Sequence, residues 1–140
     1  MLLTTANEVP TDGDWGLEVK WDGMRAQLRF DGRRVTVRSR VGRDCTAQFA
    51  ELRAISATLD DEVLLDGELV CFDHEGLPDF ERLRSRLCAH TSGAATAARL
   101  TAPATLIVFD MLHLAGRSTR QLPYCGGSRG GGLRLATGGF

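Results

Sequence analysis

Two long apolar runs constrain the fold of this chain more than any other feature of its sequence. Val63–Phe72 and Ala104–Leu114 are rich in leucine, valine and other apolar side chains, and the second is typical of a strand buried on both faces. Met24–Phe30 and Arg33–Ser39 are further strand candidates, and Asp31-Gly32 between them is a strong signal for a two-residue hairpin loop. The sequence therefore predicts a sheet at the centre of the fold.

The segments around these runs predict one more strand and two helices. In Gly16–Trp21 apolar residues alternate with polar ones, which predicts a strand that continues past the tryptophan. Thr46 is expected to cap a helix over Ala47–Leu59, whose apolar side chains form a helical stripe. Phe80–Leu87 is predicted to be a short arginine-rich helix, and Thr91–Leu100 a loop of small residues. Strands and helices together indicate an α+β fold.

The composition restricts the class of protein. The 140 residues, 43% hydrophobic and 25% charged, suit one globular domain and exclude disorder and a membrane span. The chain begins without an export signal and its four cysteines form no Cys-x-x-Cys pair, so we expect reduced thiols and a cytoplasmic protein. Residues 1–124 are expected to be the folded part, whereas 125–140, with seven of the sixteen glycines, are predicted to be a disordered tail.

The segment Glu18–Arg25, which contains the order Glu-Val-Lys-Trp-Asp-Gly-Met-Arg, carries the clearest chemical signal. Lys20 is the only lysine beside sixteen arginines, and a lysine, unlike an arginine, can lose its proton and act as a nucleophile. Arg25 can hold phosphate oxygens through two hydrogen bonds, and Gly23 allows a close approach of the backbone. The same residue types also fit a half-buried strand with a salt-bridged lysine and a turn glycine.

The order Glu-x-Lys-x-Asp-Gly-x-Arg resembles the adenylation motif of ATP-dependent DNA ligases, which are covalent nucleotidyltransferases. Three further segments follow in the order and spacing of that family. Arg38–Arg43 is similar to its second motif, Asp66–Val70 to its third, and Phe109–Leu112 to its adenine-stacking strand. Four matches in order argue against coincidence, and the resemblance is greatest to the small bacterial ligases of DNA repair, particularly actinobacterial ones.

The resemblance implies a role for each matching side chain. Contacts with ATP or AMP are expected from Glu18, Lys20, Arg25, Arg40, Glu68 and Phe109. Lys20 would be the catalytic nucleophile that takes AMP from ATP, Glu18 would lie by the adenine amino group, and Phe109 would stack on the base. Arg25 would contact the ribose and phosphate side. Glu68 would bind the ribose hydroxyl or a Mg²⁺ ion that screens the phosphates.

Two of these assignments also have a plainer interpretation. Asp66 and Glu68 are two residues apart on an apolar strand, so their carboxylates are expected on one face. Carboxylates in such a strand need a metal, a cation or hydrogen bonds, and a pair at a sheet edge bound to an arginine is the alternative to a metal site. Phe109, taken alone, would be assigned to the core.

A basic hairpin is predicted between Arg25 and Arg43, where seven arginines occur with one acidic residue, Asp31. Such a hairpin suits contacts with a phosphate backbone. The resemblance implies that Arg38, Arg40 and Arg43 bind nicked double-stranded DNA, and Arg40 would meet either the nucleotide or the 5′-phosphate. A solvated charged face is the more common meaning of a run of charges.

The resemblance covers about Trp15–Tyr124, which is part of one domain of a two-domain enzyme. Ligases continue with a Glu-containing metal motif, a Lys-x-Lys motif and an oligonucleotide-binding barrel, but this sequence has no lysine besides Lys20 and no acidic residue after Asp110. We therefore expect an incomplete, ATP-grasp-like nucleotidyltransferase domain without the barrel. The change in composition at Cys125 suggests that the tail is an out-of-frame reading of the gene.

Three functions follow as hypotheses. The chain could be a ligase that retains some self-adenylylation, or a catalytically silent fragment that at most binds nucleic acid through its arginines. The same lysine chemistry also serves RNA-ligating and RNA-capping enzymes, which use another acceptor.

Overall fold

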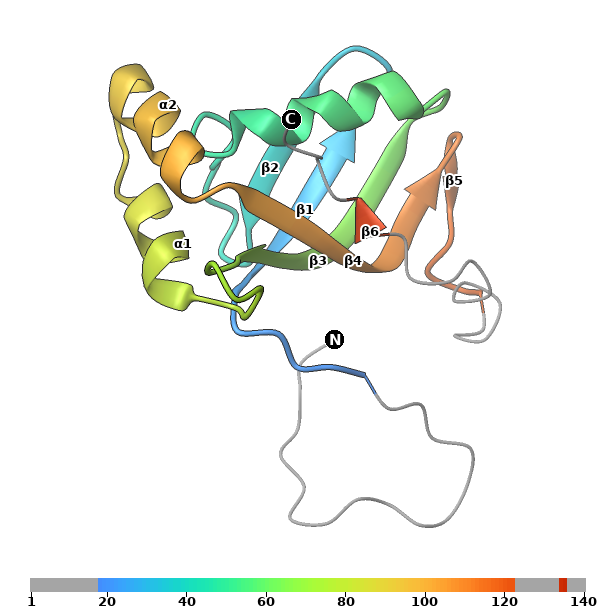
Figure 1. The fold of residues 1–140 in the computed structure, drawn as a ribbon. Helices are drawn as coiled ribbons and strands as arrows, with labels where there is room; N and C mark the ends of the chain where they lie inside the picture. The colour runs from blue at the N-terminus through green and yellow to red at the C-terminus, as the bar shows by residue number, and fades with distance from the viewer. Residues whose placement is uncertain (1–17, 123–133, 136–140) are drawn as a thin grey trace, which may run out of the picture.

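The computed structural model describes residues 18–122 and 134–135, which form an antiparallel sheet with helices (Figure 1). The strands are β1 (Met24–Phe30), β2 (Val35–Ser39), β3 (Val63–Cys71), β4 (Ala104–Leu114), β5 (Arg117–Ser118) and β6 (Arg134–Leu135). The helical elements are the 3₁₀ helix η1 (Ala50–Thr58) and the α-helices α1 (Phe80–Leu87) and α2 (Ser92–Thr101). The strand order is β2-β1-β3-β4-β5, with β6 also paired to β4. No helix in the described ranges is long and apolar enough to span a membrane.

The β1–β2 hairpin is confirmed, but its loop is longer than the predicted two residues. β1 has the predicted bounds, whereas β2 begins at Val35. The carboxylate of Asp31 accepts hydrogen bonds from the backbone N–H groups of Arg34 at 2.8 Å and Arg33 at 3.0 Å, which lowers the pKa of this carboxyl group. Gly32 follows with a φ of +85°, a conformation that favours glycine. The only acidic residue of the basic hairpin therefore has a structural role.

One hydrophobic core lies between one face of the sheet and the helical elements η1 and α1. From the strands it contains Ala26, Leu28, Phe30, Val35, Val37, Val63, Leu65, Leu69, Cys71, Ala104 and Leu106. The prediction that the whole of β4 is buried on both faces is wrong for its second half, where Phe109, Met111 and Leu114 are 40%, 37% and 41% exposed. Among the described residues, the two-residue β5 is the only outer neighbour there, so burial ends as β4 leaves the core.

The helix predicted over Ala47–Leu59 is a 3₁₀ helix that begins at Ala50, and Thr46 does not cap it. The N-cap is Phe49, without a side-chain hydrogen bond, because Thr46 Oγ1 instead accepts the N–H of Val37 in β2 at 2.9 Å. The buried apolar side chains of this segment are Phe49, Leu52 and Ile55. Their spacing of three residues matches the three residues per turn of a 3₁₀ helix.

The prediction for α1 is confirmed, whereas the prediction for the segment that forms α2 is wrong. α1 has the predicted bounds, and Asp79 caps it by accepting the N–H of Arg82 at 3.1 Å. The loop predicted over Thr91–Leu100 is instead the helix α2, because Thr91 Oγ1 accepts the N–H of Ala94 at 3.2 Å and the alanines that follow favour a helix.

The side chain of Arg86 on α1 is fully buried and joins three parts of the fold. Its two terminal nitrogens contact the Glu51 carboxylate of η1 at 2.7 and 3.0 Å. They also donate to the carbonyl oxygens of Gln48 and, at 2.7 Å, of Ala102. Glu51 in turn accepts the N–H of Ala104, the first residue of β4, at 3.1 Å. This cluster therefore fixes η1 and α1 to the start of β4.

We expect Arg86→Ala to lower the free energy of unfolding by about 3–5 kcal/mol, because it leaves a nearly buried Glu51 carboxylate without its cation. Arg84 is the matched control on the same helix, since its pair with Glu81 is exposed and Arg84→Ala should change stability by less than about 1 kcal/mol. Urea unfolding followed by circular dichroism measures both. Equal effects of the two substitutions would show that the buried pair does not hold the fold together.

Candidate functional site

The segment that carries Lys20 precedes the sheet and is not a strand. Residues 18–21 have no regular structure and β1 begins at Met24, so the strand predicted over Gly16–Trp21 is wrong in its described part. Within the described ranges these residues pair with no strand, and an alternating pattern alone supplies no hydrogen-bonded neighbour. The Trp21 ring instead packs edge-on against Phe72, with centroids 6.2 Å apart.

Gly23 brings this segment against the middle of the sheet. A Cβ atom at this position would stand 2.3 Å from the carbonyl oxygen of Leu69 and 2.8 Å from Cγ of Glu68. No other residue fits without moving the β3 backbone, so the predicted close approach is confirmed. The glycine therefore sets the chain that follows Lys20 directly beside Glu68.

Arg25 and Asp66 form a two-pronged ion pair across β1 and β3. Nε and Nη2 of Arg25 lie 3.1 and 2.8 Å from the two carboxylate oxygens of Asp66, which is only 4% exposed. The hydrogen bonds to Asp66 raise the pKa of Arg25. The same guanidinium lies 5.5 Å from the ring centroid of Phe109 on β4. The carboxylate is thus bound to an arginine, as the alternative predicted, but on an inner strand and not at a sheet edge.

Glu68 lies opposite Arg25 in the β1–β3 register. Burial raises the pKa of its carboxyl group, and the positive charges of Arg25 and Lys20 partly oppose this shift. In the described part of the chain, no hydrogen bond or ion pair engages this carboxylate.

The carboxylate of Glu68 suits one common mode of Mg²⁺ binding. No group of three or more His, Cys, Asp or Glu side chains gathers as a metal site among the described residues, and Asp66 is occupied by Arg25. Mg²⁺ is usually bound by only one or two carboxylates, with phosphate oxygens and water completing the shell. A single carboxylate therefore fits this ion when phosphate oxygens complete the shell, whereas the described residues form no cage of protein ligands.

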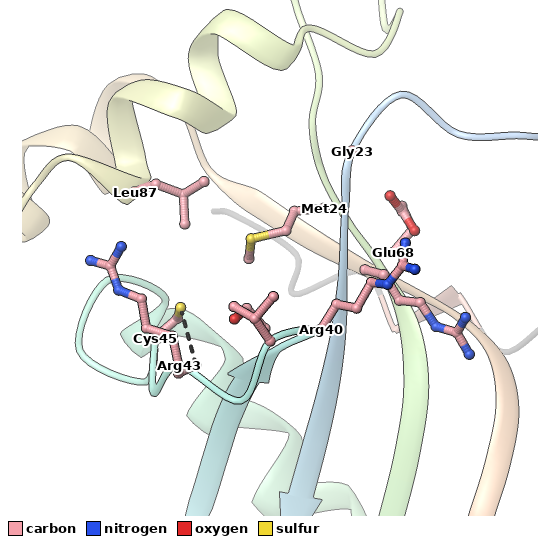
Figure 2. A pocket seen from close by; sticks show the side chains of 10 residues that line it. Gly23, Met24, Arg40, Arg43, Cys45, Glu68 and Leu87 are labelled. Carbon is pink, nitrogen blue, oxygen red and sulfur yellow. Dashed lines mark hydrogen bonds between the residues drawn. The ribbon is translucent and has the colours of Figure 1, made fainter. Parts of the chain in front are cut away.

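A pocket of about 670 Å³ lies at the ends of β1 and β2 (Figure 2). It is lined by Gly23, Met24, Arg25, Ser39, Arg40, Val41, Arg43, Cys45, Glu68 and Leu87. Figure 2 shows Glu68 and Arg40 on one side, and Cys45 and Leu87 on the other. The Ser39 hydroxyl is buried without a hydrogen-bond partner in the described part of the chain. The pocket therefore offers arginines and a carboxylate beside an apolar wall.

The structure brings some of the predicted nucleotide-binding residues together. Arg25 and Glu68 line the pocket, and Phe109 lies beside Arg25 but outside the lining. Its 40% exposure excludes the plain core assignment. Glu18 and Lys20 are exposed in the segment before β1 and do not line the pocket. The roles of all five in catalysis or binding stay predictions.

Two of the three predicted DNA-binding arginines line the pocket. Arg40 and Arg43 belong to its wall, and Arg40 is tied to β1 by a backbone hydrogen bond of 3.2 Å to the carbonyl oxygen of Arg25. Arg38, on β2, is exposed outside the lining. Their contact with DNA stays a prediction.

The apolar wall was missed by the sequence analysis. Met24, Cys45 and Leu87 come from three separate segments, and no pattern in the sequence indicates that they meet. Ser39 had a detectable signal, because it lies inside Arg38–Arg43, one of the segments that resembles a ligase motif.

The α+β fold gathers arginines, a carboxylate and an exposed aromatic ring beside a segment that carries a lysine. Such a domain is suited to binding nucleotide phosphates. Residues 4–126 match the model of the ATP dependent DNA ligase domain. The chain therefore belongs to the family of ATP-dependent DNA ligase domains.

Individual relatives and solved structures agree with this assignment. The chain is 40% identical over 105 residues to the multifunctional non-homologous end joining DNA repair protein LigD of Mycobacterium tuberculosis, covering 74% of this chain and 12% of that protein. It is 41% identical over 125 residues to DNA ligase C2 of Mycolicibacterium smegmatis, covering 89% and 34%. The crystal structure of the M. tuberculosis LigD ligase domain matches with a TM-score of 0.62 and 34% identity, covering 76% of this chain and 32% of that one. The chain thus spans between 12% and 34% of these proteins.

We expect the Arg25–Asp66 pair to couple β1 to β3 by about 1–2 kcal/mol, because it is a charge-assisted, two-pronged interaction with one partner buried. A double-mutant cycle of Arg25→Ala, Asp66→Ala and both together, followed by urea unfolding, measures this coupling. Strictly additive effects of the two substitutions would show that the pair contributes nothing beyond its separate side chains.

Glu68→Gln should stabilise the fold at neutral pH. Because the folded-state pKa of Glu68 is raised, the protonated carboxyl group favours folding at low pH, and this contribution is lost as the pH rises through the folded-state pKa. The glutamine keeps the size of the side chain and does not ionise. Unfolding curves of both proteins between about pH 4 and 8 should therefore diverge with rising pH. A wild type that is the more stable protein at pH 7 would contradict the burial argument.

Proposed function

We propose that this chain supplies the lysine-bearing adenylation part of an ATP-dependent DNA ligase, in which Lys20 takes AMP from ATP. The observation that carries this proposal is the position of Glu68, which faces Arg25 across the sheet and packs against Gly23, three residues after Lys20. Family membership and the LigD ligase-domain structure described as complexed with ATP support the same assignment.

In the first step, Nζ of the exposed Lys20 gives its proton to solvent water and attacks the α-phosphorus of ATP. The new N–P bond forms as the bond from phosphorus to the pyrophosphate oxygen breaks, and pyrophosphate leaves. Arg25, whose guanidinium is held in place by Asp66, contributes positive charge on the ribose and phosphate side. Phe109 offers its exposed ring to the adenine, and Glu18 lies by the adenine amino group.

Glu68 is the residue that would hold Mg²⁺ in this site. The ion supplies neutralisation of phosphate charge when it is bound. A single carboxylate leaves most of the Mg²⁺ coordination shell open, and phosphate oxygens can complete it. Glu68 itself remains available for this contact because Asp66 satisfies Arg25.

The later steps use DNA with a nick as the acceptor. An oxygen of the 5′-phosphate attacks the phosphorus of the lysine-bound AMP, which breaks the N–P bond and leaves AMP on the DNA end. The 3′-hydroxyl then attacks the 5′-phosphate and releases AMP, which seals the strand. Arg38, Arg40 and Arg43 hold the DNA backbone through charge-assisted hydrogen bonds.

A second candidate function is nucleic-acid binding without catalysis. It is favoured by the presence of a single lysine, because no other ammonium group in these 140 residues can hold the phosphates of ATP. Loss of one such preorganised contact commonly reduces a rate by about 100-fold or more. In ligases such contacts come from the Lys-x-Lys motif and from the barrel, whereas the ATP-grasp-like domain that we propose for these 140 residues has no Lys-x-Lys motif.

Intact-mass analysis after incubation with ATP and Mg²⁺ distinguishes the two functions. We expect a small fraction of chains to gain the mass of one AMP, about 100-fold or more slowly than a ligase that has the Lys-x-Lys motif. The adduct should vanish in Lys20→Arg, which keeps the positive charge but removes the nucleophile.

Circular dichroism should first confirm that both proteins are folded. A folded wild type that never forms the adduct would leave the second candidate, and an adduct that persists in Lys20→Arg would exclude Lys20 as the nucleophile.

A further inference from the structure

Val41 is the most exposed large apolar side chain in the described part of the molecule, at 88% exposure. It lies at the tip of the turn that follows β2 and belongs to the rim of the pocket described above. An isolated exposed valine is common on protein surfaces. The rigidity and the charge of its surroundings distinguish this one.

The turn holds Val41 away from the rest of the protein. The N–H of Gly42 donates to the carbonyl oxygen of Ser39 at 2.8 Å. The N–H of Ser39 donates to the carbonyl oxygen of Arg43 at 2.9 Å. Gly42 has a φ of +83°, where a side chain would be strained. The N–H of Arg40 is bonded to the carbonyl oxygen of Arg25, which fixes the turn to β1. The apolar tip is therefore preorganised and needs no ordering when it binds.

The surroundings of the tip are positively charged. Arg40 precedes Val41 and Arg43 follows it two residues later, and both are exposed, as is Arg38 near the end of β2. The nearest acidic residue in the sequence, Asp44, is engaged by Thr46, whose hydroxyl and backbone N–H donate to it and lower the pKa of its carboxyl group. The tip thus combines one apolar side chain with three guanidinium groups.

We propose that Val41 enters the minor groove of duplex DNA and packs against its sugars, while the adjacent arginines bind the phosphates on either side. This inference rests on the proposed function as a DNA ligase and adds a contact that depends on shape and apolar burial. The minor groove is about 6 Å wide, which admits the tip of a tight turn but not a helix. Proteins that bind this groove use arginine or lysine side chains together with inserted apolar ones.

Fluorescence anisotropy with a labelled nicked duplex, over a series of salt concentrations, tests the proposal on the full 140-residue chain. Val41→Ala should weaken binding by up to about tenfold, because two methyl groups lose their apolar burial. The dependence of affinity on salt should stay unchanged, since no phosphate contact is lost. Arg43→Ala should instead reduce the salt slope by about one.

Two controls separate the tip from general surface effects. Leu100→Ala removes another exposed apolar side chain, 76% exposed on α2, and should leave DNA affinity unchanged. Val41→Leu keeps an apolar tip and should retain most of the affinity. Because Val41 is exposed, its variants should unfold at the same urea concentration as the wild type.

The outcomes distinguish this inference from the proposed function. Wild-type affinity in Val41→Ala, together with weaker binding in Arg43→Ala, would overturn the role of Val41 and leave DNA binding intact. An equal loss on single-stranded DNA would also overturn insertion into a groove, because a single strand has none. A wild type that does not bind the nicked duplex even at low salt would overturn both proposals.

Discussion

The buried pair between Arg86 and Glu51 is the interaction on which the arrangement of this fold depends. It joins α1, η1 and the first residue of β4, and so holds the two helical elements over one face of the sheet. A buried charge pair is costly unless each partner finds further hydrogen bonds. Here Arg86 donates to the carbonyl oxygens of Gln48 and Ala102, and Glu51 accepts the N–H of Ala104. Leu87, the residue after Arg86, forms part of the pocket wall, so the same interaction sets the boundary of the candidate site.

A second arginine–carboxylate pair organises the candidate site itself. Arg25 takes both oxygens of Asp66, which leaves Glu68, two residues further along β3, with a carboxylate that no described residue binds. Burial raises the pKa of Glu68, and such perturbed groups in a pocket are typical of functional sites. The two carboxylates on this strand therefore differ, because Asp66 neutralises an arginine whereas no described residue binds the carboxylate of Glu68.

The sequence predicted the secondary-structure elements that local patterns specify. It did not predict the features that depend on tertiary contacts. β1, β4 and α1 have the predicted bounds, because apolar runs and a short amphipathic segment specify them directly. Thr46 bonds to β2 and does not cap η1, a choice that depends on a partner nine residues away. Arg86 could not be distinguished from the exposed Arg84 by sequence, since only the packing of α1 decides which arginine is buried. Family motifs identified most polar residues of the pocket, whereas its apolar wall has no sequence signal.

The two halves of the candidate site are mechanically connected through β1. The turn that carries Arg40 is hydrogen-bonded to the backbone of Arg25, and the side chain of Arg25 is fixed by Asp66 and lies over Phe109. Gly23, two residues before Arg25, presses the lysine-bearing segment against β3. The start of β1 thus positions both the segment that carries Lys20 and the guanidinium group of Arg25. It also anchors the turn that carries Arg40, so one short stretch of sequence places all three features.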